Sequence, residues 1–214
     1  MTPPITIAAL AVAGAALGLL ADRLSVRWPA HEPDYRPRGF DWRTFVLIAA
    51  GAVVFGGLTA RWSDVRDLAL LLAIASGLLV LLATDLDQKI LPDLITLPLI
   101  VVSGVLLVAG WSPLLADKEL GLASGIAAGL IAPVFLFLTD RLLHGDLGDG
   151  DLKLAVSVGL LTGISLLISG LVVASIGFSG VLLVLIAARR LSMRSPVPFG
   201  PVLIAAAFVA VLLR

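Results

Sequence analysis

Long apolar runs separated by short charged connections limit most strongly what this chain can fold into. Apolar residues make up 59% of the 214 positions and charged residues only 14%, so little polar surface is left to cover a soluble core. Backbone polar groups in hydrocarbon must be paired within the structure, and these runs lack the alternation of barrel strands. We therefore expect an all-α, polytopic integral membrane protein whose solvent is the lipid bilayer.

About eight transmembrane helices are expected, and we interpret residues 1–214 as a single membrane domain. The apolar segments are 5–20, 45–58, 68–83, 95–111, 120–138, 152–164, 166–187 and 197–213. The first is interpreted as a retained helix, because no positively charged region precedes it as in a signal peptide. A single helix over 152–187 would be about 54 Å long at ~1.5 Å per residue, against a hydrocarbon thickness of ~30 Å. A break is therefore expected within residues 162–165, Thr-Gly-Ile-Ser.

The distribution of Lys and Arg indicates how the helices are oriented, because cytoplasmic loops carry the excess. With the N-terminus outside and eight crossings, eleven of the 15 basic residues lie inside and four outside. Merging the sixth and seventh segments into one crossing changes the ratio to nine against six. Eight crossings are favoured, and seven crossings are the alternative.

Net charge and cysteine content exclude several classes of function. The formal net charge is zero, so nothing points to a nucleic acid partner. The chain has no cysteine, which excludes disulfides, thiolate metal sites and thiol nucleophiles. The one long polar stretch, residues 22–43, is expected to be a short cytoplasmic loop that is too small for a core of its own.

Acidic residues gather in two of the connections that are predicted to lie inside. The first group contains Asp85, Asp87 and Asp93. Asp85 ends a strongly apolar helix and should lie at the hydrocarbon boundary, where a carboxylate is costly and tends to mark a functional site. A solvated helix end is the alternative reading of Asp85. Asp87 is expected to be solvated, and Asp93, which follows Pro92, is expected to cap the next helix.

The second group contains Asp146, Asp149 and Asp151, with Gly148 and Gly150 between them. The pattern resembles a calcium loop, but no glutamate follows at the distance that an EF-hand needs, so a metal site is not predicted. A plain glycine-rich turn is the simpler reading. The position of Asp151 favours a functional role over a plain turn, because this residue begins a membrane helix on the same predicted side as Asp85.

Asp85 and Asp151 are expected to differ in acidity. The helix dipole disfavours a negative charge at the C-terminal end of a helix, where Asp85 lies, and favours one at the N-terminal end, where Asp151 lies. An aspartyl dyad needs this difference, because one protonated carboxyl polarises the scissile carbonyl while one ionised carboxylate activates water. Titration of the two groups as independent, unshifted carboxyls would contradict this hypothesis.

Three stretches of the chain resemble the type IV prepilin peptidases, a family of membrane aspartyl peptidases with a Gly-x-Gly-Asp motif. Asp85, followed by Leu91, Pro92 and Asp93, is similar to the first aspartate motif of the family. Residues 148–153, Gly-Asp-Gly-Asp-Leu-Lys, are similar to its second. Residues 197–201, Val-Pro-Phe-Gly-Pro, resemble the start of its last helix.

The resemblance implies a site and a reaction. Asp85 and Asp151 match the catalytic aspartates of the family. The residues that match its supporting or substrate-binding positions are Gly148, Asp149, Gly150, Lys153, Pro92 and Asp93. The glycines would allow a tight turn beside the substrate. The implied activity is prepilin leader peptidase: hydrolysis of the basic leader of a type IV pilin-like precursor, at the cytoplasmic face of a bacterial or archaeal inner membrane.

The N-terminal part departs from the family pattern. Members that also methylate the new N-terminus usually carry a larger cytoplasmic domain with paired Cys-x-x-Cys motifs that hold zinc, whereas residues 22–43 are short and free of cysteine. His31 and Glu32 are interpreted as part of a solvated loop and not as metal ligands. We therefore expect no metal and no cofactor, and methyltransferase activity is not supported.

Two alternatives to a prepilin peptidase are left open. Gly-x-Gly-Asp also marks presenilin-like proteases that cut within membrane helices, and the position of the cleaved bond distinguishes them. A transporter or scaffold subunit would use the aspartates as an ion path or a binding surface, although the inverted halves of many transporters are not seen in this sequence. The sequence predicts neither the particular precursor nor the oligomeric state.

Overall fold

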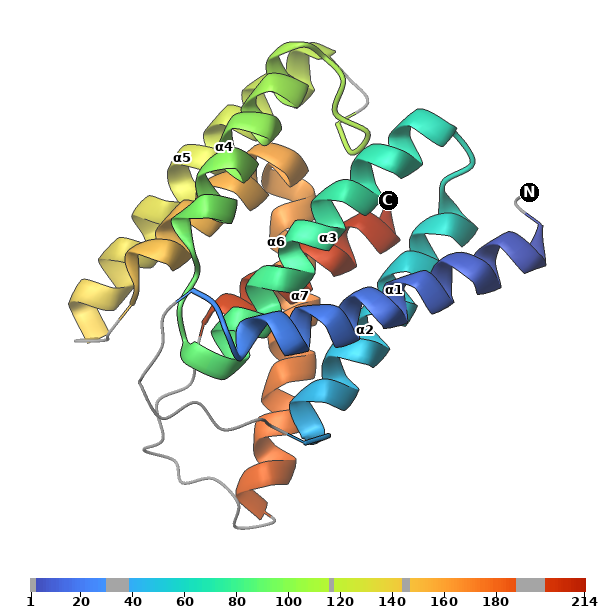
Figure 1. Cartoon of the computed structure of the whole chain (residues 1–214). Coiled ribbons are helices and arrows are strands. Elements are labelled where there is room, and N and C mark those ends of the chain that lie inside the picture. The colour runs from blue at the N-terminus through green and yellow to red at the C-terminus, as the bar shows by residue number, and fades with distance from the viewer. Residues whose placement is uncertain (1–2, 30–38, 116–117, 144–146, 188–198) are drawn as a thin grey trace. The chain divides into compact units, whose positions relative to one another are not determined.

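The computed structural model describes residues 3–29, 39–115, 118–143, 147–187 and 199–214. Within these ranges all regular secondary structure is helical (Figure 1). The helices are α1 (Pro4–Ser25), α2 (Trp42–Arg61), α3 (Val65–Gln88), α4 (Asp93–Val108), α5 (Lys118–Leu143), α6 (Asp149–Ala187) and α7 (Gly200–Leu213). The predicted all-α fold class is therefore confirmed.

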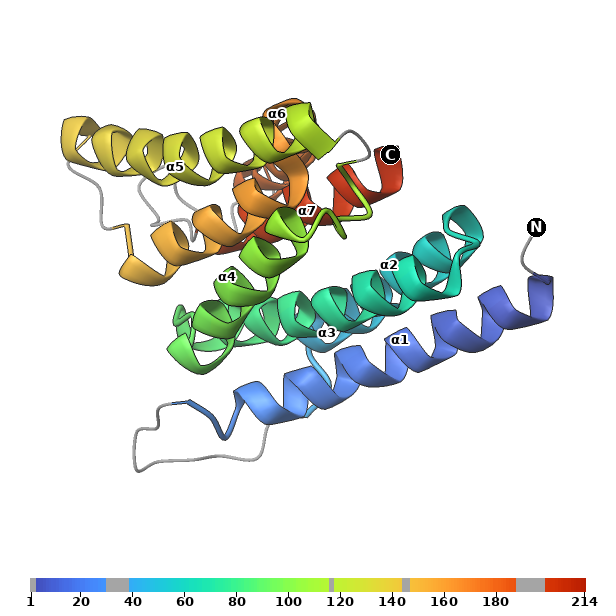
Figure 2. The same cartoon turned by 90° about the horizontal axis from the view of Figure 1, so that it is seen from above.

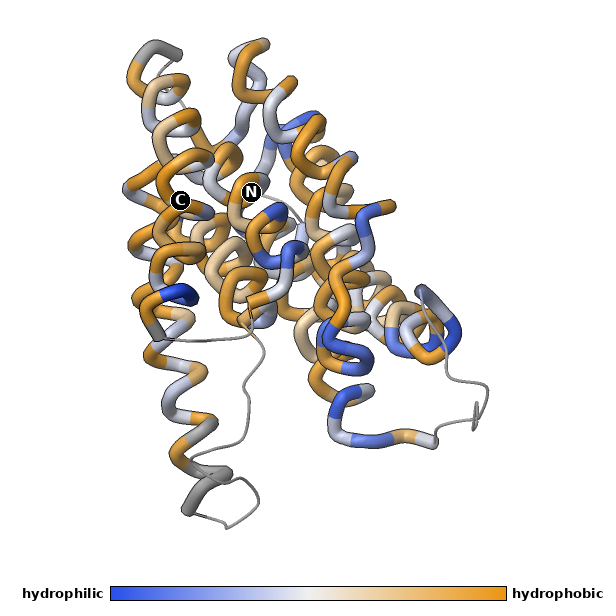
Figure 3. The backbone as a smooth tube through the Cα atoms, turned by 90° about the vertical axis from the view of Figure 1, so that its left-hand side faces the viewer, coloured by the Kyte–Doolittle hydropathy of each residue, from blue (hydrophilic) through white to orange (hydrophobic). Residues whose placement is uncertain are grey.

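Five of these helices are long and apolar enough to cross a membrane. They are α1, α2 and α3, residues Leu120–Leu142 of α5 and residues Asp149–Val181 of α6. Helices α4 and α7 are apolar but have only 16 and 14 residues, short of the ~20 that cross a bilayer squarely. Figure 3 shows hydrophobic residues along most of each helix and hydrophilic residues mainly at helix ends and connections. The chain is thus a multi-pass membrane protein.

The chain divides into two compact units, Met1–Val102 and Ser103–Arg214. In the first unit, α1, α2 and α3 lie side by side (Figures 1 and 2). Glycines bring the α1 and α2 backbones together: a Cβ on Gly51 would lie 2.0 Å from the carbonyl oxygen of Gly14, and one on Gly18 would lie 2.1 Å from that of Leu47. Small residues allow such close packing between membrane helices.

In the second unit, α5 packs along the first half of α6, and α7 packs on the second half. The α6 helix is broken at Gly163, with φ 65° and ψ 179°, a conformation essentially restricted to glycine. The freed amide of Ile164 donates a hydrogen bond to Ser124 Oγ at 2.9 Å. The predicted break within residues 162–165 is therefore confirmed, and a backbone hydrogen-bond donor released by it is satisfied from α5.

The helices extend further into the polar connections than hydropathy predicted. Helix α1 continues through Asp22 to Ser25, and α2 begins at Trp42. Asp22 and Arg43 thus belong to helices and not to the expected loop of residues 22–43. Asp22 is fully buried and accepts a hydrogen bond from the Thr44 hydroxyl at 2.9 Å, which allows a carboxylate to remain in the helix. His31 and Glu32 lie outside the described residues.

Candidate active site

Asp85 lies in the last turn of α3, as predicted from the end of the apolar segment. Its side chain and backbone are 5% exposed, and the preceding Thr84 is fully buried. The carbonyl oxygen of Asp85 accepts the amide of Lys89 at 3.0 Å. Lys89 adopts a left-handed conformation, with φ 55° and ψ 37°, and so ends the helix. Asp85 is therefore a buried carboxyl that lies one turn from the end of its helix.

Polar side chains from three helices meet at this end of the first unit. We call them the polar layer: Asp22, Ser25, Asp41, Arg43, Thr44, Asp87 and Gln88. Arg43 pairs with Asp87 at 2.5 Å. Thr44 donates to Asp22 at 2.9 Å and also completes a capping box with Asp41 at the start of α2. The layer holds the end of α1, the start of α2 and the end of α3.

Most of the polar layer was missed from the sequence, and one expectation about it was wrong. Asp87 was expected to be solvated, but its side chain is only 15% exposed and pairs with Arg43. Arg43 and Asp87 lie 44 positions apart, so the sequence around Asp87 does not indicate this ion pair. The available signal was the position of Asp22 and Arg43 beside apolar segments, where a charge needs a partner.

Pro92 and Asp93 form the start of α4. The Pro92 carbonyl accepts the amides of Ile95 and Thr96 at 3.0 and 3.1 Å. Asp93 is exposed and is the first residue of α4. It therefore lies one position after the N-cap position that was predicted for it. A carboxylate in the first turn is still favoured there by the helix dipole. Pro92 itself is buried, so this corner is fixed by packing as well as by hydrogen bonds.

Asp151 lies in the first turn of α6, as predicted. Its amide donates to the carbonyl of Gly148 at 3.0 Å, while its Oδ1 is buried and makes no hydrogen bond to any described residue. A Cβ added to Gly148 would lie 3.8 Å from Asp151 Oδ2, an ordinary contact, and Gly148 does not adopt a positive φ. A Cβ would therefore fit at this position, and the backbone conformation does not require glycine.

The remaining predicted residues of this region have different surroundings. Asp149 is exposed, and Gly150 and Lys153 are half-buried. Asp146 lies outside the described residues. In the third stretch, Phe199 precedes α7, and Pro201 stands in its first turn, where the missing amide hydrogen costs nothing. Val197 and Pro198 also lie outside the described residues.

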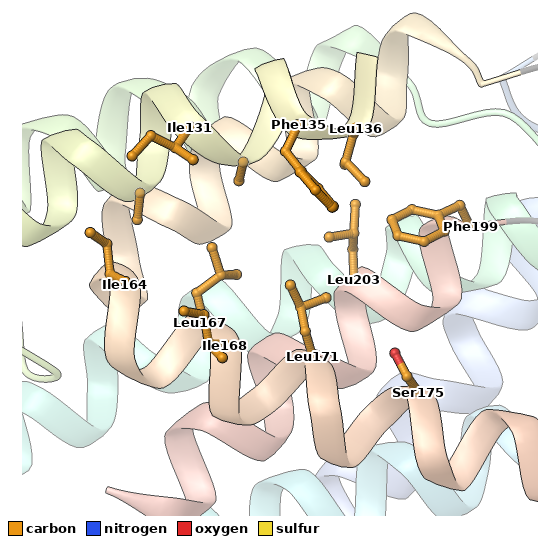
Figure 4. A pocket seen from close by; sticks show the side chains of 12 residues that line it. Ile131, Phe135, Leu136, Ile164, Leu167, Ile168, Leu171, Ser175, Phe199 and Leu203 are labelled. Atoms are coloured by element: carbon orange, nitrogen blue, oxygen red, sulfur yellow. The ribbon is translucent and has the colours of Figure 1, made fainter. Parts of the chain in front are cut away.

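The second unit contains an apolar cleft of about 520 Å³ between α5, the second half of α6 and the start of α7 (Figure 4). Phe135 of α5, Leu171 of α6 and Phe199, just before α7, point into it. The described residues that line it are apolar except for Ser175, so these walls can contact apolar groups. In the described parts of the chain, no three His, Cys, Asp or Glu side chains gather closely enough to hold a metal ion.

Fold and site together define a class of protein: a helical multi-pass membrane protein with one buried and one half-buried aspartate, each in the terminal turn of an apolar helix. Residues 70–213 match the type IV leader peptidase family, and this range contains both aspartates and all of α7. The chain belongs to this family.

Curated relatives agree with this assignment. A prepilin leader peptidase/N-methyltransferase of Aeromonas salmonicida (strain A449) is 37% identical over 169 residues, which cover 75% of this chain and 53% of the relative. A protein of the same name from Bacillus subtilis (strain 168) is 29% identical over 177 residues, or 79% of this chain and 62% of the relative. The chain thus spans about half the length of the first of these relatives. No solved structure shows a significant match.

Proposed function

We propose that this chain is a prepilin leader peptidase, an aspartyl endopeptidase that removes the leader of a type IV pilin-like precursor. The observation that carries the proposal is the family match over residues 70–213, which includes Asp85 and Asp151. The buried position of Asp85, together with a buried Asp151 Oδ1 that makes no hydrogen bond to a described residue, supports their use as a catalytic pair. The prediction that they act together comes from the family resemblance.

In the proposed reaction the two carboxyls share one proton around a water molecule. The ionised carboxylate removes a proton from the water, whose oxygen attacks the scissile carbonyl carbon, while the protonated carboxyl donates its proton to the carbonyl oxygen. Collapse of the tetrahedral intermediate breaks the C–N bond, and the amine leaves with a proton returned by the pair. The products are the free leader and a mature protein that begins with its apolar helix.

The proposal includes a topology. Eight crossings, with the N-terminus outside, place both aspartates at the cytoplasmic face of an inner membrane. The break at Gly163 supports this count, because it separates α6 into two segments of the lengths predicted from the sequence. Helices α4 and α7 would cross as short spans.

We limit the proposal to peptidase activity. The relatives carry N-methyltransferase in their names, and family members with that activity usually have a zinc domain built on paired cysteines. This chain has no cysteine at any of its 214 positions. Lys153, Asp149, Pro92 and Asp93 are proposed as supporting or substrate-binding residues of the same site.

Separate Asp85→Asn and Asp151→Asn variants test the proposal in membranes that contain a pilin-like precursor. Each is expected to lower the rate of leader removal at least ~100-fold, because each removes a proton-transferring group. Asp149→Asn should have a smaller effect, and Asp67→Asn, near the other end of α3, should have none. Processing of either aspartate variant at the unmutated rate, with equal expression, would show that the dyad is wrong.

A substrate comparison separates the proposal from a presenilin-like protease. A pilin-like precursor and an unrelated single-span protein, both tagged, are incubated with the same membranes. Cleavage of the precursor just before its apolar helix is expected, with no cleavage of the unrelated protein. Cleavage inside the apolar helix of either substrate would favour the presenilin-like alternative.

A further inference from the structure

Gln88 ties the last turn of α3 to the end of α1. Its side-chain Nε2 donates to the carbonyl oxygen of Ser25 and, at 3.3 Å, to that of Trp28. Ser25 is the last residue of α1, and carbonyls at a helix C-terminus have no partner within their own helix. The Gln88 amide therefore satisfies a backbone acceptor that α1 leaves open, and Ser25 is itself fully buried.

This tie lies on the same side of α3 as Asp85. The two residues are three positions apart in a continuous helix, and residues i and i+3 share a face. Lys89 ends the helix immediately after Gln88. The turn that carries Asp85 is thus a terminal turn, which frays unless side chains hold it.

A second tie holds the same turn to α2 through the Arg43–Asp87 pair. The side chains of Arg43 and Asp87 are 30% and 15% exposed, and ion pairs that water can reach contribute little to stability. The Gln88 bond differs, because it ends on backbone atoms whose positions are fixed by α1 itself. It therefore sets the distance between the two backbones more directly than the ion pair does.

We propose that Gln88 is a positioning residue for Asp85: by donating to the end of α1, it holds the α3 turn in the arrangement that catalysis needs. The inference rests on the proposed function and deepens it. Because the Gln88 amide bonds within the protein, its removal should leave substrate binding unchanged. A shift of about 1 Å in a catalytic group can cost ~100-fold in rate, so the effect should fall on kcat.

Three variants test the kinetic consequence. Gln88→Met keeps the length of the side chain but removes the donor, whereas Gln88→Lys keeps a donor. Asp64→Ala is the matched control, because Asp64 caps the same helix at its other end by accepting the amides of Arg66 and Asp67. Each is assayed for kcat, KM and thermal stability, with rates expressed per folded molecule.

Gln88→Met is expected to lower kcat at least tenfold with KM changed less than twofold, and Gln88→Lys should restore most of the rate. Asp64→Ala should lower thermal stability while kcat stays at the unmutated value. The inference is overturned if Gln88→Met retains full kcat, or if Gln88→Lys is as slow as Gln88→Met. If Gln88 had a purely structural role, all three variants would be less stable, and kcat would not fall in Gln88→Met and recover in Gln88→Lys.

A second measurement does not use catalysis. Because the chain has no cysteine, Asp85→Cys provides a single thiol whose alkylation rate reports how well position 85 is held. Adding Gln88→Met should raise that rate several-fold, and adding Asp64→Ala should not. Equal rates in all three backgrounds would overturn the inference. If the thiol responds but Asp85→Asn still processes precursor, the positioning stands and the proposed function fails.

Discussion

Gly148 lies beside Asp151, where an added Cβ would make only an ordinary 3.8 Å contact with the carboxyl. The backbone of Gly148 forms a hydrogen bond with the Asp151 carboxyl, and its conformation is open to residues other than glycine. Family resemblance alone suggested a tight turn as the reason for glycine here. The structure shows that the backbone conformation of Gly148 does not require glycine, and we propose instead that glycine leaves room for a substrate or a water molecule.

Gly148→Ala is therefore expected to process precursor within a few-fold of the unmutated rate, because its Cβ would make only an ordinary 3.8 Å contact with Asp151. Gly148→Leu should lose most activity, because its longer side chain is expected to press against the Asp151 carboxyl. Leader removal per folded molecule measures both. If the alanine variant is as inactive as the leucine variant, backbone conformation and not volume explains the glycine.

The sequence correctly located Asp85 and Asp151 at helix ends, because carboxylates are rare beside apolar runs and hydropathy shows such positions directly. Gln88, Thr44 and Asp22 were missed for the opposite reason. Their hydrogen-bonding partners come from other helices, and no local pattern shows which distant carbonyl or carboxylate a polar side chain will meet. Because polar residues were interpreted as loop, the predicted ends of α1 and α3 came several residues too early.

At the scale of elements, the α1–α2 pair depends on glycines in direct backbone contact. Gly51→Ala is expected to destabilise the first unit strongly, because its Cβ would lie 2.0 Å from the Gly14 carbonyl oxygen and overpacking costs about 1–3 kcal/mol or more. Gly104→Ala, where no atom lies within 4 Å of the added Cβ, is the control. Thermal unfolding in detergent compares them, and equal midpoints for the two variants would contradict the packing described here.

The break in α6 shows which element-level features can be predicted. A continuous helix over residues 152–187 is longer than the hydrocarbon layer, so length alone required an interruption. The glycine at position 163 and its φ of 65° fulfil that requirement. The contact with Ser124 could not be predicted, since it depends on how α5 packs along α6.

At the scale of the whole molecule, orientation can be measured because the chain has no cysteine to interfere. Ser63 and Lys89 are both exposed and lie just beyond opposite ends of α3. In intact cells, an impermeant maleimide should label Ser63→Cys and leave Lys89→Cys unlabelled, and inverted vesicles should give the reverse. Labelling of Lys89→Cys from outside would contradict the orientation predicted from the basic residues.

The central proposal is that Asp85 and Asp151 act together on one water molecule. Cross-linking of an Asp85→Cys/Asp151→Cys double variant in native membranes measures this directly, with Asp64→Cys/Asp151→Cys as the control. The account predicts that the first pair is joined within one chain by oxidation or by a short dithiol-reactive reagent, and that the control pair is not. Two thiols in the first pair that react separately with maleimide but never with each other would contradict it.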